Sequence, residues 1–245
     1  MSSLQKFHRR TNGGAPSFVA VAPVDKSSLV GTLNFTGTVL TNATQKKYGV
    51  ASTYIPQSSC VYTNKSSTYQ LGSADFTMET WVYVVNTPVS SYPAFISFGD
   101  GSSYGIGSFI NHAAWPNKIT IEGNCTGGSF LANGNIDIPN NAWTHVAYVR
   151  SSSNLKIYVN GVLDFTIAIP GNGSFNHATK MPGFFTNSRP GPTSGDIIIS
   201  TLYIDDLRVT KNVARYTSNF TPPAELPVGG ADPYWSNVVL LLNGE

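Results

Sequence analysis

The chain has 245 residues, of which 41% are hydrophobic, 12% aromatic and only 11% charged. A chain of this length can bury a stable hydrophobic core without disulfide bonds or structural metal ions. A charged fraction far below the usual ~25% is typical of a surface that is polar but carries few charges. Three of the 15 basic residues, Lys6, Arg9 and Arg10, lie in the first ten positions, so the rest of the chain is almost neutral. This argues against nucleic acid as a partner, and we expect the basic arm to be solvated or ordered by a neighbouring subunit.

The cysteines and the apolar segments narrow the class of protein further. Two cysteines, Cys60 and Cys125, are too few for a disulfide framework or a metal cluster, which leaves either one bridge or two free thiols. No apolar run approaches the ~18 residues of a membrane span, and the basic N-terminus continues into the polar sequence TNGGAPSF. We therefore expect neither a signal peptide nor a membrane partner.

Short alternating or β-branched runs, bounded by Gly, Pro, Asn and Ser, predict strands from one end of the chain to the other. No helical stripe lasts for three turns, and no helical segment of crossover length separates the runs. The spacing therefore predicts a two-sheet antiparallel sandwich. In chain order the expected strands are 17–24, 76–85, 94–98, 118–122, 142–150, 155–159, 162–169, 196–210 and 238–242.

The clearest local prediction is a β-hairpin formed by residues 142–150 and 155–159 around the turn sequence SSSN. Asn160 and Gly161 follow, and both residues tolerate the positive φ of a tight turn. The next strand then ends before Pro170, which cannot donate to a sheet ladder.

Two long segments, 88–134 and 170–195, read as irregular and are rich in Gly and aromatic residues. Loops on a rigid sandwich are where binding residues concentrate. Trp115, with Tyr104 and His112, is the best candidate glycan site, because a sugar ring stacks on an aromatic face while amide groups bind its hydroxyls. The alternative is that these aromatic residues pack on their own loop or on a neighbouring subunit.

Two long stretches, NAWTHVAYVRSSSNLKIYVNGV and YIDDLRVTKNVARYTSNFTPP, resemble the laminin-G-like, concanavalin A-like domains found in structural proteins of tailed bacteriophages. LGSADFTMETWVYV and VDKSSLVGTLNFTGTVLTNATQKKYG are similar to earlier parts of the same domains, and ARYTSNFTPP is the most specific block. The resemblance implies an all-β, two-sheet antiparallel jelly-roll sandwich. It also divides the chain into a basic arm (1–15), a jelly-roll domain (16–223), a Pro/Gly spacer (224–230) and a C-terminal strand (231–245).

The distribution of carboxylates argues against an enzyme. Retaining glycosidases of this fold carry Glu-x-Asp-x-x-Glu on one strand, and none of the four glutamates (Glu79, Glu122, Glu225 and Glu245) has a second carboxylate two residues later. No Gly-x-Ser-x-Gly nucleophile sequence joins a strand to a helix. His145, inside a strand, is interpreted as structural, and a polysaccharide lyase using Tyr, His and Arg has no motif to support it.

Asp205 and Asp206 form an acidic pair within a predicted strand. Alternation from Leu207 and Val209 predicts that Asp205 faces inward and Asp206 outward. An inward carboxylate needs partners, either Arg150 or backbone N–H groups. In related domains an aspartate at this position, with one in the opening turn, can hold calcium, which would implicate Asp25 and Asp205.

Glu79 shares a strand face with Trp81 and Tyr83, and we expect it to be partly buried and structural.

The resemblance and the missing catalytic groups together predict a non-catalytic bacteriophage virion protein: a capsid decoration or spike protein, or a short tail-fibre subunit. Such a protein would be made in the host cytoplasm, contact other virion proteins and surface glycans, and assemble as a homo-oligomer, with a trimer favoured by symmetric virion positions. The alternative from a different class is a carbohydrate-binding adhesion module.

The run Val238–Leu242 consists of five aliphatic residues after the Pro/Gly spacer. An unpaired strand of this kind would aggregate, so it must pair either with its own sandwich, beside SFVAVAPV, or with a neighbouring subunit. We expect pairing within the same domain, burial on both faces and Trp235 as an anchor.

Overall fold

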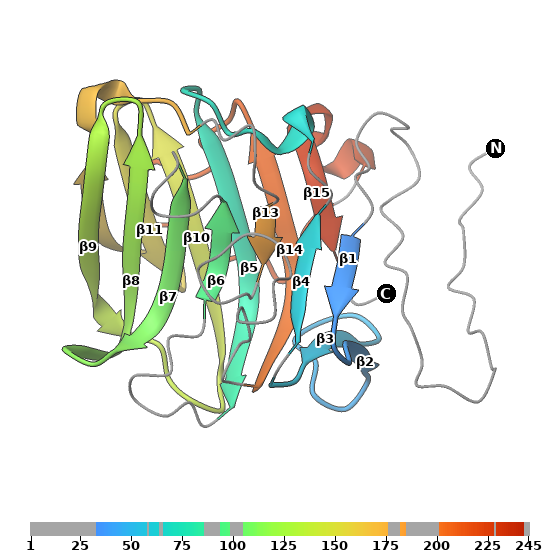
Figure 1. Ribbon diagram of the computed structural model, residues 1–245. Helices are drawn as coiled ribbons and strands as arrows, with labels where there is room; N and C mark the ends of the chain where they lie inside the picture. The colour runs from blue at the N-terminus through green and yellow to red at the C-terminus, as the bar shows by residue number, and fades with distance from the viewer. Residues whose placement is uncertain are drawn as a thin grey trace.

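The computed structural model describes residues 33–57, 59–63, 66–85, 94–98, 105–175, 182–184, 201–227 and 229–242, and it contains two antiparallel sheets packed face to face (Figure 1). One sheet has the order β1 (Leu33–Thr36), β4 (Cys60–Thr63), β13 (Pro182–Phe184), β6 (Ala94–Phe98), β7 (Ile106–His112), β8 (Trp115–Cys125) and β9 (Gly128–Asp137). The other has the order β12 (Val162–Ala168), β11 (Asn154–Val159), β10 (Trp143–Ser151), β5 (Phe76–Val85), β14 (Thr201–Lys211), β3 (Ser52–Ile55) and β2 (Leu40–Asn42), with β15 (Val238–Leu242) also paired to β14. The predicted sandwich is confirmed.

Helical structure in the described residues is confined to four single 3-10 turns, η1 (Ser67–Tyr69), η2 (Pro170–Asn172), η3 (Gly229–Ala231) and η4 (Trp235–Asn237). None of the helices seen in this part of the chain has the length and apolar character to cross a membrane.

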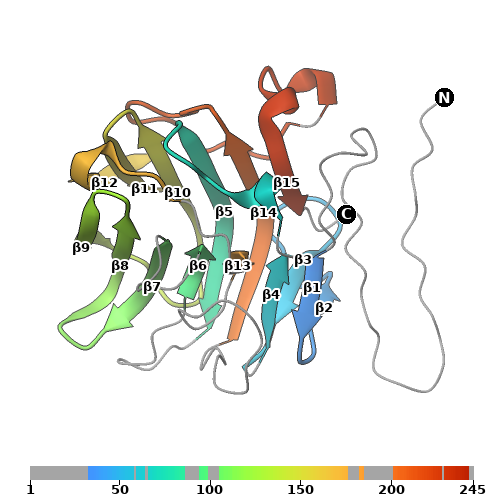
Figure 2. The same cartoon turned by 45° about the horizontal axis from the view of Figure 1, so that its top comes forward.

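The core lies between the two sheets, which Figure 2 shows as two curved layers. Met78 and Val82 of β5 face Ile119 and Ile121 of β8 within a single cluster of buried apolar side chains. One polar pair crosses the core, where the Tyr148 hydroxyl lies 2.6 Å from Ser108 Oγ. Burial raises the pKa of Tyr148 far above its ordinary value, so this hydroxyl stays neutral.

The strands with the clearest alternation are confirmed. Residues 76–85 form β5, which lies between β10 and β14 near the middle of its sheet. The predicted hairpin is the β10–β11 pair, and Asn160 (φ 49°) and Gly161 (φ 78°) form the following tight turn. Pro170 follows β12 and opens η2.

The segment 88–134 is less irregular than we expected from its glycines. Its described part forms β6, β7, β8 and most of β9, which make a meander of antiparallel strands. Glycines within these strands have a packing reason: the ring of Phe130 on β9 occupies the space that a side chain at Gly123 on β8 would need. The interpretation of Trp115 as a loop residue is wrong, because Trp115 is the first residue of β8.

The C-terminal strand pairs within its own chain, as we expected. Antiparallel partners include Leu207 with Leu242 and Val209 with Leu240, so β15 continues the same edge of β14 that β3 occupies further back (Figure 1). The partner is therefore β14, whereas the expected neighbour SFVAVAPV lies outside the described residues.

Both faces of β15 are covered. Leu240 and Leu242 join the main core, while Val238 and Leu241 pack with Leu226 and the half-buried Trp235 on the other face. The expected burial of this strand and the anchoring role of Trp235 are confirmed.

Cys60 and Cys125 are both buried and are not joined by a disulfide, so the bridge that the sequence left open is not formed. The Cys125 thiol donates weakly to the carbonyl oxygens of Gly128 (3.3 Å) and Pro170 (3.4 Å).

Candidate functional site

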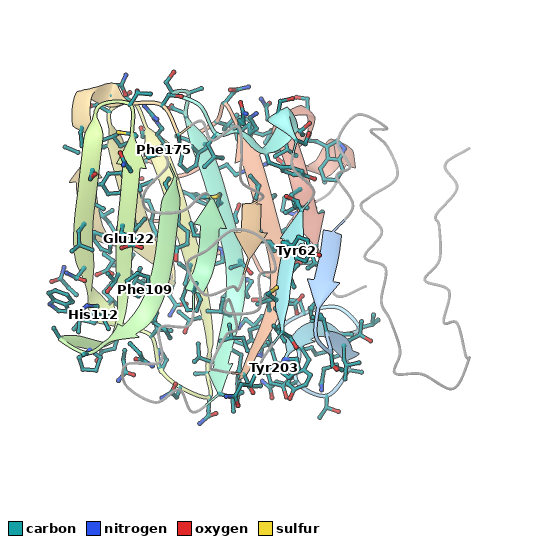
Figure 3. All side chains as sticks on the ribbon, viewed as in Figure 1. Tyr62, Phe109, His112, Glu122, Phe175 and Tyr203 are labelled. Carbon is teal, nitrogen blue, oxygen red and sulfur yellow. The ribbon has the colours of Figure 1, made fainter. Side chains whose placement is uncertain are left out.

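Two of the three predicted glycan-binding residues lie together at the end of the β7–β8 hairpin. His112 and Trp115 are cross-strand partners on either side of a two-residue turn, and their ring centroids lie 4.6 Å apart. The ring of Phe109 follows at 6.4 Å from His112, and Figure 3 shows both labelled residues on β7. His112 and Trp115 are each half-buried, so part of each ring is open to a ligand. Tyr104 lies outside the described residues.

Amide and charged groups surround this hairpin tip. Asn111 Oδ1 accepts the Asn117 backbone N–H at 2.6 Å, and both asparagines have positive φ, which fixes the turn at the strand ends. The Lys118 ammonium lies 2.8 Å from Asp137, at the surface. Asn111 is completely buried, so the partly exposed hydrogen-bonding side chains at the tip are those of Asn117 and Lys118. Together with the partly exposed rings they make a composition that suits a sugar ring.

The acidic pair of β14 sits on a bulge that sequence alternation did not anticipate. Asp206 has φ of 52°, and the pairing with β5 breaks between Asp205 and Arg208. One extra residue reverses the alternation, so that Ile204 and Leu207 both face the core. Asp205 consequently lies on the outer face, paired with Trp81, and the prediction that it points inward is wrong.

Asp205 is nevertheless buried, because the segment around Lys47 and Tyr48 covers it. Its Oδ2 atom accepts the backbone N–H groups of both residues, each at 3.1 Å. The backbone-amide alternative is confirmed. The other candidate partner, Arg150, donates instead to the carbonyl oxygens of Gly72 and Gly173, at 3.2 and 2.8 Å.

Asp206 is also buried, which corrects the expectation that it points into solvent. The bulge turns its side chain toward the C-terminal segment, where Oδ2 accepts the Leu226 N–H at 3.0 Å. Burial, with the negative charges of Asp205 and Glu225, raises the pKa of Asp206 to about 7, although the Leu226 hydrogen bond opposes the shift. The bulge thus fastens two distant segments to β14.

The described residues do not fit the calcium site that the resemblance implies. Two N–H groups point their positive ends at Asp205 Oδ2, where a cation would be repelled. Among the described residues no group of three His, Cys, Asp or Glu side chains could hold a metal. Asp25 lies outside the described residues, so calcium binding stays a prediction.

Replacing Asp205 with alanine is expected to lower the free energy of unfolding by about 1–3 kcal/mol, because two buried N–H groups lose their acceptor. Thermal melting with and without a calcium chelator measures both the loss and any metal contribution. Asp205→Asn, which keeps an acceptor oxygen, is the matched control. A melting curve that Asp205→Ala leaves unchanged would contradict the buried placement, and a chelator effect abolished by the substitution would support calcium.

Glu79 lies at the centre of a buried ionic cluster on the outer face of the eight-stranded sheet, so the expected structural burial is confirmed and is complete. Its Oε1 accepts Nε and Nη2 of Arg208 at 2.9 and 2.6 Å, and its Oε2 accepts the Tyr216 hydroxyl at 2.7 Å. His145 Nε2 lies 3.3 Å from Oε2. Arg208 also contacts Asp232.

Burial alone would raise the pKa of Glu79, but the neighbouring His145, the charge of Arg208 and the Tyr216 hydroxyl together lower it to about 2. The carboxylate therefore stays ionised. His145 and Glu79 are both completely buried, so no substrate can reach this histidine–carboxylate pair. The cluster holds the fold together and has no accessible acid or base, which confirms the structural interpretation of His145.

A second group of aromatic residues was not singled out from the sequence. Tyr54, Tyr203, Tyr83 and Trp143 lie on four adjacent strands, β3, β14, β5 and β10, and each is half-buried. Successive ring centroids lie 4.9, 5.7 and 5.6 Å apart. We call these four residues the aromatic row.

Comparison with known proteins agrees with this architecture. Residues 57–214 match the Concanavalin A-like lectin/glucanases superfamily in its laminin G form, and the chain belongs to this family. A search of curated proteins gave no significant match.

Several solved structures share the fold. The binding domain of Paraclostridial Mosquitocidal Protein 1 has a TM-score of 0.55 and 11% identity, covering 77% of this chain and 44% of that one. A candidate carbohydrate binding protein from Bacteroides ovatus ATCC 8483 has a TM-score of 0.54 and 16% identity, covering 78% and 48%. A structure of botulinum neurotoxin type C, whose cell entry depends on interaction with two ganglioside molecules, has a TM-score of 0.51 and 19% identity, covering 87% and 48%. The chain spans less than half the length of each, and at these identities the likeness concerns the fold alone.

Proposed function

We propose that the protein is a non-catalytic carbohydrate-binding protein whose glycan site includes Trp115 and His112. The observation that carries this proposal is the half-exposed pair of rings at the end of the β7–β8 hairpin, tilted 38° to each other with centroids 4.6 Å apart, beside the half-buried Asn117. Aromatic faces bind the C–H face of a sugar, while amides bind its hydroxyls. Membership of a lectin and glucanase superfamily supports a carbohydrate ligand, and the inaccessible Glu79 favours binding over hydrolysis.

A glycan array tests the proposal. We expect the wild-type protein to bind at least one class of glycan, and Trp115→Ala to weaken that binding by about 10-fold or more, since truncating an aromatic anchor of a binding site costs on the order of 2 kcal/mol. Tyr234→Ala is the matched control, because Tyr234 is an exposed aromatic residue on the C-terminal segment. Unchanged thermal melting of both variants ensures that folding is intact. Failure of the wild-type protein to bind any glycan, or binding that Trp115→Ala leaves unaltered, would contradict the proposal.

We also propose that the protein acts as a bacteriophage virion component, as a capsid decoration, spike or short tail-fibre subunit. The support is the resemblance of residues 141–162 and 203–223 to domains of phage structural proteins, including the block ARYTSNFTPP. In this role its partners are other virion proteins and further copies of the chain, with a trimer favoured. Mass spectrometry of purified particles from the source, and sedimentation of the isolated protein, test the location and the assembly. Absence from purified particles would refute the virion role and leave carbohydrate binding untouched.

A further inference from the structure

The four residues of the aromatic row are in register across the sheet. Tyr54 pairs with Tyr203, Tyr203 with Tyr83, and Tyr83 with Trp143 as direct antiparallel Cα partners. The row therefore runs perpendicular to the strands at one level, near the end of the sheet where Figure 3 labels Tyr203. Cross-strand pairing alone places side chains about 4.5–5.5 Å apart, so a flat register of this kind yields a continuous line of rings.

The row lies on the outer face of the eight-stranded sheet. The alternate neighbours Val82 and Val84 of β5, and Leu202 and Ile204 of β14, all belong to the core between the sheets. Side chains on a strand alternate between faces, so the aromatic row points away from that core. Neighbouring rings in the row pack tilted or edge to face, with interplanar angles of 38°, 87° and 61°, and each residue is partly exposed.

The shape of the row suits a narrow ligand better than a protein surface. Aromatic side chains bury roughly 150–250 Å² each, so four half-buried ones offer at most about 400 Å². A standard protein interface needs about 800 Å² from each partner, which a single line of four rings does not supply. A chain-like ligand only one residue wide can contact all four rings.

The electrostatics of the row suit an uncharged ligand. None of its four side chains carries a formal charge at neutral pH, and burial, with the neighbouring Tyr54 and Tyr83, raises the pKa of Tyr203. Asp205 lies on the same face two residues from Tyr203, but it is buried and bonded to the backbone N–H groups of Lys47 and Tyr48. The Lys47 ammonium lies 4.3 Å from the Trp81 ring. Neutral hydroxyls beside aromatic faces are the groups that bind neutral sugars.

We propose that the aromatic row binds a linear, uncharged oligosaccharide lying across β10, β5, β14 and β3, at a site separate from Trp115. The proposal rests on the carbohydrate-binding function above and adds both a second surface and the class of glycan. Successive sugar rings stack on successive aromatic rings, so affinity grows with the length of the glycan. A protein with two such surfaces on different sheets can hold two glycan segments at once.

Titration calorimetry with neutral oligosaccharides of one to six residues tests the length dependence. The probes are β-1,4-linked glucose, mannose and N-acetylglucosamine and α-1,4-linked glucose. We expect affinity for one series to rise at least 10-fold between one and four residues. Tyr203→Ala, at the centre of the row, removes this gain, Tyr203→Phe retains most of it, and Trp115→Ala leaves it intact. Tyr54→Ala, at the end of the row, removes one contact and so reduces the gain in affinity for the longest glycans. It keeps the test valid if Tyr203→Ala fails to fold.

The outcomes separate this proposal from the proposed function. If no neutral series binds with a length dependence while the glycan array signal still depends on Trp115, the aromatic row is not a glycan site. The proposed function would then remain standing. A length-dependent signal that Tyr203→Ala and Tyr54→Ala both leave unchanged would also overturn the proposal for the row. Preferential binding of a proline-rich peptide, the other chain-like ligand of aromatic grooves, would do the same.

Discussion

Deleting residues 231–245 is expected to lower the free energy of unfolding by at least about 5 kcal/mol, which is comparable with the whole stability of many domains. The deletion removes four buried aliphatic side chains of β15, each of which contributes about 1.5–3 kcal/mol when fully buried. It also exposes the edge of β14 at residues 207–210. Asp232 is lost as well, which leaves Arg208 and Arg215 without that partner.

Thermal and urea unfolding measure this loss, and sedimentation reports whether the exposed edge aggregates. A synthetic peptide of residues 231–245 is the matched control, because strand addition to β14 restores the melting temperature if the edge is otherwise intact. A truncated protein that melts like the full chain but no longer assembles would show that the strand pairs between subunits in solution. That result would contradict the internal pairing.

Residue patterns within single segments were enough to predict the strands and turns that form from neighbouring residues. The β10–β11 hairpin follows from strict alternation on both sides of a polar turn, and Asn160 and Gly161 adopt the positive φ that their residue types tolerate. The covered position of β5 likewise follows from apolar residues on both of its faces.

The bulge at Asp206 could not be predicted in the same way. An aspartate at positive φ is allowed, but nothing in YIDDLRV indicates which of its residues is the extra one. Because strand alternation has a period of two, this one residue reversed the predicted direction of Asp205. It also turned the side chain of Asp206 toward the C-terminal segment, where it is buried. Only the pairing with β5 reveals the shift.

The aromatic row was missed because it exists only after the sheet has formed. Its members come from four segments that are far apart in the chain, and their alignment depends on the register of three strand pairs. The sequence does contain one signal. Tyr83 lies between Val82 and Val84, which face the core, so it was identifiable as an outward-facing aromatic residue. Alternation counted from Leu207 instead placed Tyr203 inward, because the bulge was not foreseen.

The most specific block of the resemblance, ARYTSNFTPP, has a structural explanation. Tyr216 stacks on Phe220 with centroids 3.6 Å apart and donates to Glu79, while Arg215 binds Asp232 through two hydrogen bonds. The block covers the buried ionic cluster on the outer face of the sheet. The specificity of the block therefore reflects how this fold is closed, whereas in our proposal ligand choice depends on exposed residues such as Trp115.

Glu79→Ala is expected to cost about 3–5 kcal/mol of unfolding free energy, because it leaves the buried guanidinium of Arg208 with one fewer carboxylate partner. Glu79→Gln is the matched control that keeps the shape and removes only the charge. Replacing both partners, by Glu79→Leu with Arg208→Met, should recover part of the loss, since no unpaired charge remains in the interior. Urea unfolding at pH 7 measures all three.

The pH dependence provides an independent check on the same residue. The pKa of Glu79 falls from its ordinary value of 4.5 to about 2 in the folded protein. Between these values the unfolded chain binds the proton more readily, so the stabilisation is complete above pH 4.5 and is lost as the pH falls toward 2. Urea midpoints measured between pH 7 and pH 2.5 should therefore decline more steeply for the wild-type protein than for Glu79→Gln, which has no carboxylate at this position to protonate. Parallel declines in the two proteins, or a Glu79→Ala variant within about 1 kcal/mol of wild type at pH 7, would mean that the cluster contributes little and that apolar packing alone holds ARYTSNFTPP against the sheet.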